Sequence, residues 1–274
     1  MPPKGVAMPR ALHDEMAAVR RLATEAGTFL LEHHGEVRRV DRKGAVDLVT
    51  DIDRRSEERL LAAIADDFPD DAIEAEEGGD RAGRSGRLWY VDPLDGTTNY
   101  VHGHSHFAVS LACCDDQGPL LGAVYAPYLD ELYVAGRELG AVQVRPRRGD
   151  ERPLPRRGPV AFTDALLATG FSYERDERID RICELMRRCL RRGCHGMRRA
   201  GSAAIDLAQV GAGRLDGFFE LTLRPWDVAA GTLVCRETGC LVTDMDAVEH
   251  PLQWESVLAG PPVLHAELAE LIRE

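Results

Sequence analysis

Two aspartates, Asp92 and Asp95, follow a short apolar run in the segment 89–99, WYVDPLDGTTN. The run 88–91 is typical of a buried strand, and Pro93 is expected to end it because proline has no backbone N–H for the sheet. Both carboxylates should then leave the sheet at one edge. Neighbouring carboxylates repel each other unless a cation lies between them, and oxygen ligands suit Mg²⁺ better than zinc. The spacing therefore predicts a hard-cation site.

The residues after Asp95 could bind an anion beside that cation. Gly96, Thr97 and Thr98 are expected to begin a helix or turn, where backbone N–H groups are free to receive an anion. Asp-Pro and Asp-Gly pairs are also common turn formers. By itself, the segment leaves a simple solvated turn open as the alternative.

Three further acidic residues have ordinary explanations when each is taken alone. Asp53 precedes an apolar periodic run at 56–61, so it is expected near a helix N-terminus, where it could be only a cap. Glu76 follows a strand-like start at 72–75 and precedes a glycine pair, which also fits an exposed loop. Asp227 is expected in the first turn of a small-residue helix, where the helix dipole favours a carboxylate. As a set, they are better explained by one shared acidic site.

These segments together resemble the inositol monophosphatase family. The resemblance rests on WYVDPLDGTTNY at 89–100, DLVTDID at 47–53, the glutamate pair at 76–77 and WDVAAG at 226–231, in the expected order from about Lys43 to Gly239. It implies a Mg²⁺-dependent, lithium-sensitive phosphomonoesterase that forms a homodimer. It also implies an αβαβα sandwich of the sugar phosphatase type.

The resemblance assigns metal ligands residue by residue. Glu76, Asp92 and the backbone carbonyl of Leu94 would bind a first Mg²⁺, and Asp92, Asp95 and Asp227 would bind a second. A third, weaker ion would reach Glu76 through water. The expected complement is two to three Mg²⁺ ions in each site.

The resemblance also assigns catalytic and substrate-binding roles. Thr97, hydrogen-bonded to Asp53, would hold and deprotonate the metal-bound water that attacks phosphorus, and Glu76 would help to orient that water. The backbone of Gly96 and Thr97 would grip phosphate oxygens. The other residues expected to contact substrate are Asp95, Gly201, Ser202, Ala203, Glu220 and Asp227.

These roles also make chemical sense. Uncatalysed hydrolysis of phosphate monoesters is so slow that enzymes must accelerate it by about 10²¹-fold. Two divalent ions about 3.5–4 Å apart can both generate hydroxide and neutralise charge on the phosphate. A covalent serine or cysteine mechanism has less support, because the sequence has no Gly-x-Ser-x-Gly motif and no P-loop-like cysteine motif.

The chain departs from the family pattern at two places, and a pair of arginines near the substrate segment is a further feature. Ala75 stands where the family usually has glycine, which matters only if that position needs a positive φ. The segment 237–240 reads ETGC instead of the usual EAGG. Arg198 and Arg199 lie near the predicted substrate segment and could meet an anionic substrate or a partner subunit, although a solvated surface arginine is the simpler interpretation.

Composition is that of a folded enzyme. The 274 residues are 44% hydrophobic, which suffices for a large core in one compact unit. There is no apolar stretch long enough to cross a membrane, and residues 1–5 lack the apolar core of a signal peptide, so we expect a cytoplasmic protein. The formal charge of −12 disfavours general nucleic-acid binding. One basic cluster stands against that trend: Arg187, Arg188, Arg191, Arg192, Arg198 and Arg199.

The seven cysteines are odd in number and have no paired spacing that indicates a disulfide framework, so reduced thiols are expected. Cys189, Cys194 and His195 lie close in sequence. Their spacing is poor for zinc, and a fourth ligand is not evident.

The hydrophobic pattern predicts two lobes, 1–150 carrying most metal ligands and 151–274 carrying Asp227 and substrate contacts, with a linker at 145–158. Helices are expected at 11–34, 53–67, 177–190, 203–210, 226–238 and 263–272. Strands at 108–114, 120–125, 132–135 and 141–144 predict an antiparallel sheet in the first lobe. The second lobe alternates helix and strand, with strands at 215–219, 240–243 and 257–258 and a short segment near His195, which indicates a layered α/β fold.

The preferred function is hydrolysis of inositol monophosphate or a similar small polyol phosphate. Thr98 and Glu220 favour this substrate by family analogy. Alternatives within the class are fructose 1,6-bisphosphate, histidinol phosphate and a 3′-phosphonucleotide. A different class remains open as well, a non-catalytic scaffold that binds RNA or protein through its arginine cluster.

Overall fold

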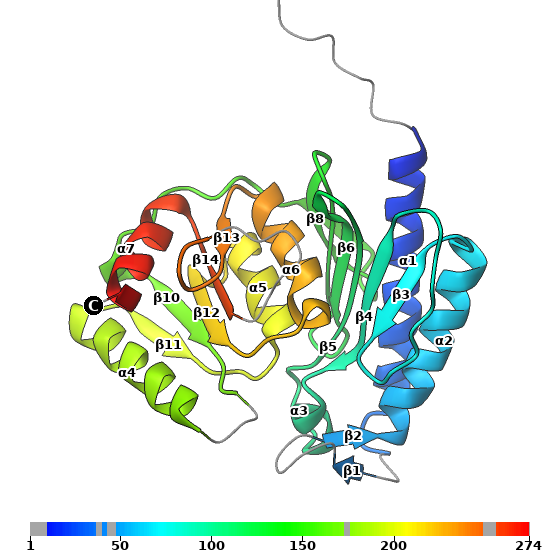
Figure 1. The fold of residues 1–274 in the computed structure, drawn as a ribbon, viewed down its shortest axis with the longest axis horizontal. Coiled ribbons are helices and arrows are strands. Elements are labelled where there is room, and N and C mark those ends of the chain that lie inside the picture. The colour runs from blue at the N-terminus through cyan, green and yellow to red at the C-terminus, as the bar shows by residue number, and fades with distance from the viewer. Residues whose placement is uncertain (1–9, 37–39, 43–47, 173–175, 249–255, 274) are drawn as a thin grey trace, which may run out of the picture.

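The computed structural model describes residues 10–36, 40–42, 48–172, 176–248 and 256–273, and these form five layers. From right to left in Figure 1, two helices cover a seven-stranded sheet, two more helices separate it from a five-stranded sheet, and two helices cover that sheet's outer face. This order confirms the predicted αβαβα sandwich. The helices are α1 (Arg10–Glu32), α2 (Asp51–Asp67), α4 (Glu177–Arg192), α5 (Ala203–Ala212), α6 (Pro225–Glu237) and α7 (Pro262–Arg273).

The larger sheet has the strand order β3-β4-β5-β6-β7-β8-β9. Only the β3–β4 pair is parallel, and each later pair is antiparallel, as the short turns between successive strands require. The strands are β3 (Ala72–Ala75), β4 (Leu88–Asp95), β5 (Ala108–Asp115), β6 (Gly118–Ala126), β7 (Glu131–Gly136), β8 (Gly140–Arg145) and β9 (Asp150–Pro153). The prediction of an antiparallel sheet in this part of the chain is confirmed.

The predicted linker at 145–158 is partly wrong. Within it, β9 pairs with β8 along the sheet edge, from Arg145↔Asp150 to Val142↔Pro153. All four side chains of β9 are exposed, so the strand carries no apolar pattern that would have revealed it. Backbone pairing with β8 forms it instead.

The smaller sheet has the order β11-β10-β12-β14-β13. The first three strands are parallel, and β14 runs antiparallel to both of its neighbours. The strands are β10 (Leu166–Thr169), β11 (Gly196–Arg198), β12 (Gly217–Leu221), β13 (Leu241–Thr243) and β14 (Ser256–Gly260). Shorter elements complete the described chain: the β1 (Val40–Arg42) and β2 (Leu48–Thr50) pair, α3 (Thr97–Val101) and η1 (Phe162–Asp164).

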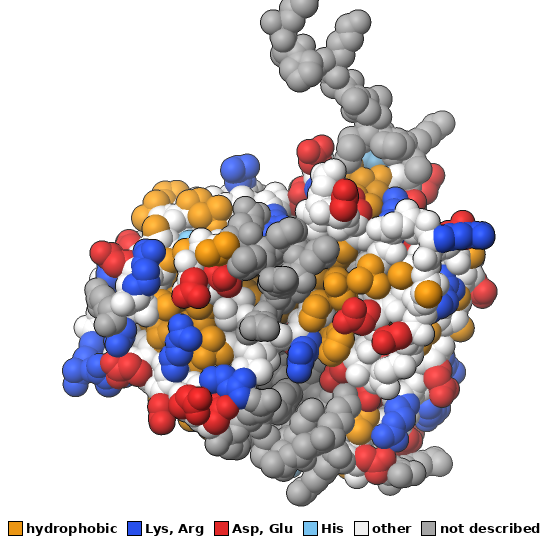
Figure 2. All heavy atoms as spheres, viewed as in Figure 1, with side chains coloured by type: hydrophobic (Ala, Val, Ile, Leu, Met, Phe, Trp, Pro, Cys, Tyr) orange, Lys and Arg blue, Asp and Glu red, His pale blue; other side chains and the backbone are white. Residues whose placement is uncertain are grey.

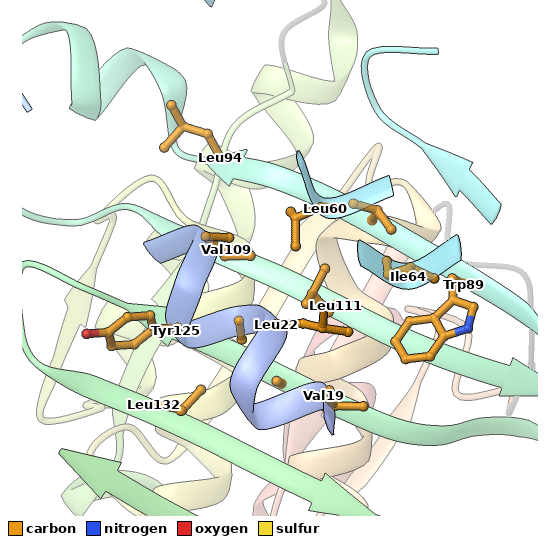
Figure 3. Close-up of a cluster of buried hydrophobic side chains, with 14 of the residues drawn as sticks. Val19, Leu22, Leu60, Ile64, Trp89, Leu94, Val109, Leu111, Tyr125 and Leu132 are labelled. Carbon is orange, nitrogen blue, oxygen red and sulfur yellow. The ribbon is translucent and has the colours of Figure 1, made fainter. Parts of the chain in front are cut away.

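The largest apolar core lies between the seven-stranded sheet and the helices α1 and α2 (Figure 3). Val19 and Leu22 on α1 and Ile64 on α2 are fully buried against the sheet, as helical spacing of apolar residues requires. Trp89 of β4 is also fully buried, and its indole Nε1 donates a hydrogen bond to Asp71 at 2.9 Å. Each such side chain contributes about 1.5–3 kcal/mol on burial, so this core holds β4 firmly in place.

Helices α5 and α6 pack against both sheets. Ala229 and Ala230 of α6 join the core on the seven-stranded side, whereas Val228 and Cys235 join the core on the five-stranded side. The middle layer of helices thus packs against both sheets.

The division into lobes at 1–150 and 151–274 stays a prediction. Among the described helices, none combines the length and apolar character needed to cross a membrane.

Candidate active site

Strand β4 carries both aspartates, because it is longer than the sequence predicted. It continues through Pro93 to Asp95, so the expectation that Pro93 ends the strand is wrong. The register with β5 shifts between Asp92 and Asp95, and such an irregularity tolerates a residue without a backbone N–H. Asp92 is buried, and its Oδ1 accepts a hydrogen bond from the Leu94 backbone N–H at 2.9 Å.

The predicted ligands and substrate contacts line one pocket. Glu76 follows β3, Asp92 and Asp95 lie on β4, and Asp227 is the third residue of α6. The pocket therefore lies where the ends of elements from both halves of the chain converge. The predicted residues that line it are Glu76, Asp92, Leu94, Asp95, Gly96, Thr97, Gly201, Ser202, Ala203, Glu220 and Asp227.

Burial and mutual repulsion raise the pKa values of Asp92, Asp95 and Asp227. The pKa of Asp92 is raised well above its usual value by burial and then by the charges of Glu76, Asp95 and Asp227. The pKa of Asp227 is raised for the same two reasons. Burial also raises the pKa of Asp95 to about 6, against hydrogen bonds that favour its charged form. A cation among these oxygens would relieve that repulsion, and an all-oxygen donor set suits Mg²⁺.

Asp95 and Asp227, like Asp92, have protein donors that fix the orientation of the carboxylate. Ser202 Oγ donates to Asp95 Oδ2 at 2.6 Å, as does the Ala204 backbone N–H at 2.9 Å, and the Arg224 N–H donates to Asp227 at 2.7 Å. In this arrangement no three Asp, Glu, His or Cys side chains of the described residues form a group that could hold a metal ion. The oxygen donors that line the pocket are nevertheless of the type that suits Mg²⁺, and the particular ligand set stays a prediction.

Thr97 and Asp53 form a hydrogen-bonded pair at the edge of the pocket. Thr97 Oγ1 lies 3.0 Å from Asp53 Oδ1 and 3.1 Å from the Leu94 carbonyl. Asp53 is the third residue of α2, as the sequence indicated, and Thr50 caps that helix through a reciprocal capping box. Burial raises the pKa of the fully buried Asp53, whereas hydrogen bonds from Thr50 and Thr97 favour its charged form.

Glycine is required at the turn between β4 and α3. Gly96 has φ +88°, and a Cβ there would lie 2.9 Å from the His106 carbonyl oxygen. Thr97 therefore begins α3 directly after Gly96, and its N–H is one of the first-turn groups without an intrahelical acceptor. The predicted helix start at Gly96–Thr98 is confirmed.

Hydrogen bonds from Asn99 connect the chain just before the predicted substrate segment, residues 201–203, to this turn. Its Nδ2 donates to the backbone carbonyls of His106 at 2.6 Å and Ala200 at 2.8 Å. Ser202 then caps α5 by accepting a hydrogen bond from the Ile205 N–H. One side chain from α3 thus places the loop before α5 beside Asp95.

Sequence reasoning missed part of the pocket wall. Thr222, which follows β12, has a strained positive φ of 66°. Gly170, which follows β10, lies against Glu220 of β12, because β10 and β12 are neighbouring parallel strands whose ends share one edge. That strand pairing was the signal that could have located them. The missed lining residues are Gly170, Phe171, Ser172, Thr222 and Leu223, together with Arg199, which had been assigned no definite role.

Glu220 contributes a half-buried carboxylate to the pocket wall. Its pKa is raised well above the usual value by burial, then by the charges of Asp206 and Asp227, and the nearby charge of Arg199 partly offsets this. Arg199 also lies over the Phe171 ring, 5.4 Å from its centroid. Arg199 thus brings a positive charge to a largely acidic wall.

The arginine cluster on α4 is largely neutralised by acidic partners. Arg187 and Arg188 both pair with Glu184, and Arg192 lies 3.0 Å from Glu267 on α7. In Figure 2, basic and acidic side chains accordingly alternate at the lower left, over α4. A solvated, ion-paired helix face explains this part of the cluster.

The departure at Ala75 has no structural cost, because this residue lies in extended strand β3 opposite Val91.

The chain is similar to known proteins over nearly its whole length. The model of the inositol monophosphatase family matches residues 12–274. The Nus factor SuhB of Pseudomonas aeruginosa is 41% identical over 88% of this chain and 89% of that protein. The inositol-1-monophosphatase of Mesorhizobium japonicum is 38% identical over 92% of this chain and 93% of that protein.

The solved structure of the extragenic suppressor protein suhB from Bartonella henselae has the same fold. Its TM-score is 0.88 at 32% identity, covering 95% of this chain and 99% of that one. The layered fold and the acidic pocket thus place the chain in the class of sugar phosphatase-type αβαβα sandwiches. The chain belongs to the inositol monophosphatase family, as the sequence motifs indicated.

Proposed function

We propose that this protein is a Mg²⁺-dependent phosphomonoesterase that hydrolyses inositol monophosphate to inositol and phosphate. One observation carries the proposal: Glu76, Asp92, Asp95 and Asp227 line the same pocket as Thr97, which is hydrogen-bonded to Asp53. A scaffold without activity has no need to bury mutually repelling carboxylates, because such burial is costly unless a cation or a reaction uses it.

The ions would be held by Glu76, Asp92, the Leu94 carbonyl, Asp95 and Asp227, in keeping with their oxygen donors and shared pocket. When bound, two to three Mg²⁺ ions would lower the pKa of a water molecule and neutralise negative charge on the phosphate. Bound ions would favour the charged forms of these carboxylates, because their positive charge would offset the repulsion that raises the pKa values of Asp92 and Asp227.

Thr97 and Asp53 would handle the proton. The Asp53 carboxylate accepts the Thr97 hydroxyl hydrogen, which leaves the Thr97 oxygen free to accept a hydrogen bond from the attacking water. Threonine alone is a poor base, but with Asp53 behind it the pair needs only to relay a proton. Glu76, on the same pocket wall, would help to orient that water.

Substrate would be held on two sides of the reacting phosphate. The N–H groups of Gly96 and Thr97 would donate to phosphate oxygens at the start of α3. The polyol hydroxyls would meet polar groups of the second half of the chain: Ser202, the backbone of Gly201 and Ala203, Glu220 and the carboxylates of Asp95 and Asp227. This wall determines which leaving group fits.

A phosphate-release panel tests the substrate. We expect inositol 1-phosphate to be hydrolysed with a higher kcat/KM than fructose 1,6-bisphosphate, histidinol phosphate or a 3′-phosphonucleotide, and Li⁺ to inhibit the reaction. A higher kcat/KM for any of the other three would reassign the substrate within the phosphatase class.

Gel filtration with light scattering tests the homodimer, and fractionation of the source cells tests the expected cytoplasmic location.

A second candidate function is a scaffold that binds RNA or protein, and a specific observation favours it: a relative 41% identical to this chain is a Nus factor. The ion pairs of Arg187, Arg188 and Arg192 reduce the positive charge available for nucleic acid. RNA binding that persists in an Asp95→Asn variant, together with no phosphate release by the parent protein, would favour the scaffold.

A further inference from the structure

Two helices of this protein end in the same short sequence pattern. Residues 189–194 read CLRRGC at the end of α4, and residues 235–240 read CRETGC at the end of α6. In both, a cysteine in the last turn is followed five residues later by a cysteine directly after a glycine. The second motif includes the position where this chain has cysteine in place of the glycine usual in the family.

Both motifs adopt the same helix-ending geometry. Gly193 has φ +92° and Gly239 has φ +83°, the left-handed conformation that ends a helix. The Cys240 N–H donates to the Cys235 carbonyl at 2.9 Å, and the Gly239 N–H donates to the Arg236 carbonyl, also at 2.9 Å. The equivalent bond from Cys194 to Cys189 measures 3.2 Å. These are the paired bonds of a Schellman motif.

A Schellman motif brings two particular side chains together. The residue after the glycine usually contacts the residue five positions earlier, and that contact is apolar in most proteins. Here both positions are cysteines. At the end of α6 the Cys235 thiol donates a hydrogen bond to the Leu207 carbonyl at 3.1 Å, and Cys235 and Cys240 are close enough for each thiol to shift the pKa of the other. All seven cysteines are free thiols in this structure, so both pairs are reduced dithiols.

Both cysteine pairs lie near an arginine, Arg157 for Cys240 and Arg192 for Cys189. The neighbouring Cys235 thiol and then the nearby Arg157 guanidinium lower the pKa of the Cys240 thiol. Within the described residues, the buried Nε of Arg157 has no hydrogen-bond acceptor of its own. By contrast, burial raises the pKa of the other three thiols, Cys189, Cys194 and Cys235, so Cys240 is the one of the four whose pKa is lowered. The thiolate is the nucleophile in oxidation, so the α6 pair should react first.

We propose that Cys235 and Cys240 are an oxidation site, at which hydrogen peroxide forms an internal disulfide that closes the C-terminal end of α6. Cys240 retains 4% exposure and Cys235 has none, so peroxide meets Cys240 first. The Cys240 thiolate attacks one peroxide oxygen, the O–O bond breaks, and hydroxide leaves. The sulfur becomes a sulfenic acid as the peroxide is reduced.

The disulfide follows in a second step. Cys235 loses its proton and attacks the Cys240 sulfur, so the S–S bond forms as the S–O bond breaks. The departing hydroxide takes up a proton and leaves as water. In total, two thiols and one hydrogen peroxide give one disulfide and two waters. The short chain between the two cysteines keeps the attacking thiol beside its target.

The test uses mass spectrometry on the full chain carrying Cys183→Ser, which removes the exposed thiol that could link two molecules. Reduced protein is treated with graded hydrogen peroxide, quenched with catalase, alkylated with N-ethylmaleimide under denaturing conditions and digested with trypsin without reductant. Trypsin cleaves after Arg236, between the two cysteines, so a Cys235–Cys240 disulfide joins two otherwise separate peptides.

We expect the linked peptides at peroxide concentrations that leave most of the Cys189–Cys194 pair alkylated, and their loss after treatment with dithiothreitol. Cys113 and Cys114 provide an internal control, because their side chains lie in cores on opposite faces of the seven-stranded sheet. They should remain alkylated.

A Cys240→Ser variant should lose the linked peptides, and the matched Cys194→Ser variant should keep them. The proposal is overturned if Cys235 and Cys240 are recovered on separate alkylated peptides at excess peroxide, or if Cys189–Cys194 closes first. It is also overturned if Cys240 passes to sulfinic acid without forming the link. The first measurement uses a chain that keeps both Cys194 and Cys240. Its result therefore decides the proposal whether or not the Cys240→Ser and Cys194→Ser variants fold.

Discussion

At the scale of single residues, protonation decides what the pocket can bind. A shared acidic site could be predicted from the order of the acidic residues along the chain, because ordinary roles such as helix capping explain each residue alone but not the whole set. These residues are Asp53, Glu76, Asp92, Asp95 and Asp227. Their raised pKa values were not predictable, since these arise from burial and from neighbours distant in sequence.

Mg²⁺ binding should therefore depend on pH. Protons compete with the ion for the carboxylates, and the pKa of Asp95 is raised to about 6. The dissociation constant for Mg²⁺ should be at least about twofold smaller at pH 8 than at pH 6, because about half of Asp95 is protonated at pH 6 and the raised pKa values of Asp92 and Asp227 add to the competition. Isothermal titration of the protein with MgCl₂ measures this. An affinity that is constant from pH 6 to 8 would contradict the assigned ligands.

Thr97 should matter for turnover and not for ion binding. Thr97→Ala removes the hydroxyl bonded to Asp53, so kcat should fall by about 10²–10⁴-fold, whereas Mg²⁺ affinity should stay within about twofold. Thr97→Ser keeps the hydroxyl and should retain most activity. Steady-state kinetics on all three proteins tests this. An alanine variant as active as the serine variant would rule out the proton role.

At the scale of elements, sequence patterns located the helices well and the strand ends poorly. Caps such as Thr50 with Asp53 are local, so the start of α2 was predictable within two residues. Pro93 was expected to stop β4, but a register shift against β5 lets the strand continue. Strand β9 escaped prediction because its side chains are all exposed and only its pairing with β8 defines it.

The capping box of α2 should link stability to activity. Thr50 is fully buried, and its hydroxyl and backbone N–H both bond to Asp53 Oδ2. Thr50→Val keeps the shape and removes the hydroxyl, so unfolding in urea should require about 1–2 kcal/mol less and kcat should fall as Asp53 loses its anchor. Thr50→Ser is the matched control and should retain both. A valine variant with unchanged kcat would show that Asp53 needs no such anchor.

At the scale of the whole molecule, the site depends on how closely the layers approach. The alternation of helix and strand predicted layers, but no local pattern could show that α6 lies directly against β6. Gly122 permits this contact: a Cβ there would lie 3.1 Å from Ala230 Cα and 3.2 Å from its carbonyl oxygen. Because α6 carries Asp227 in its first turn, the spacing of the two layers also positions that carboxylate.

Gly122→Val should push these layers apart. We expect a loss of about 1–3 kcal/mol in the free energy of unfolding and a weaker affinity for Mg²⁺, since Asp227 moves with α6. Gly158→Ala is the control, because a Cβ there meets nothing within 4 Å. Urea unfolding and isothermal titration measure the two effects. Stability equal to the parent's would mean that the layers can separate without cost.

The most direct test of the proposed function is the initial rate of phosphate release from inositol 1-phosphate as Mg²⁺ is varied, for the parent protein and Asp95→Asn. The acidic pocket predicts a rate that rises with Mg²⁺ to saturation, disappears in EDTA and falls by several orders of magnitude in the variant. Phosphate release that continues unchanged in EDTA, or an Asp95→Asn protein as fast as the parent, would contradict the proposal.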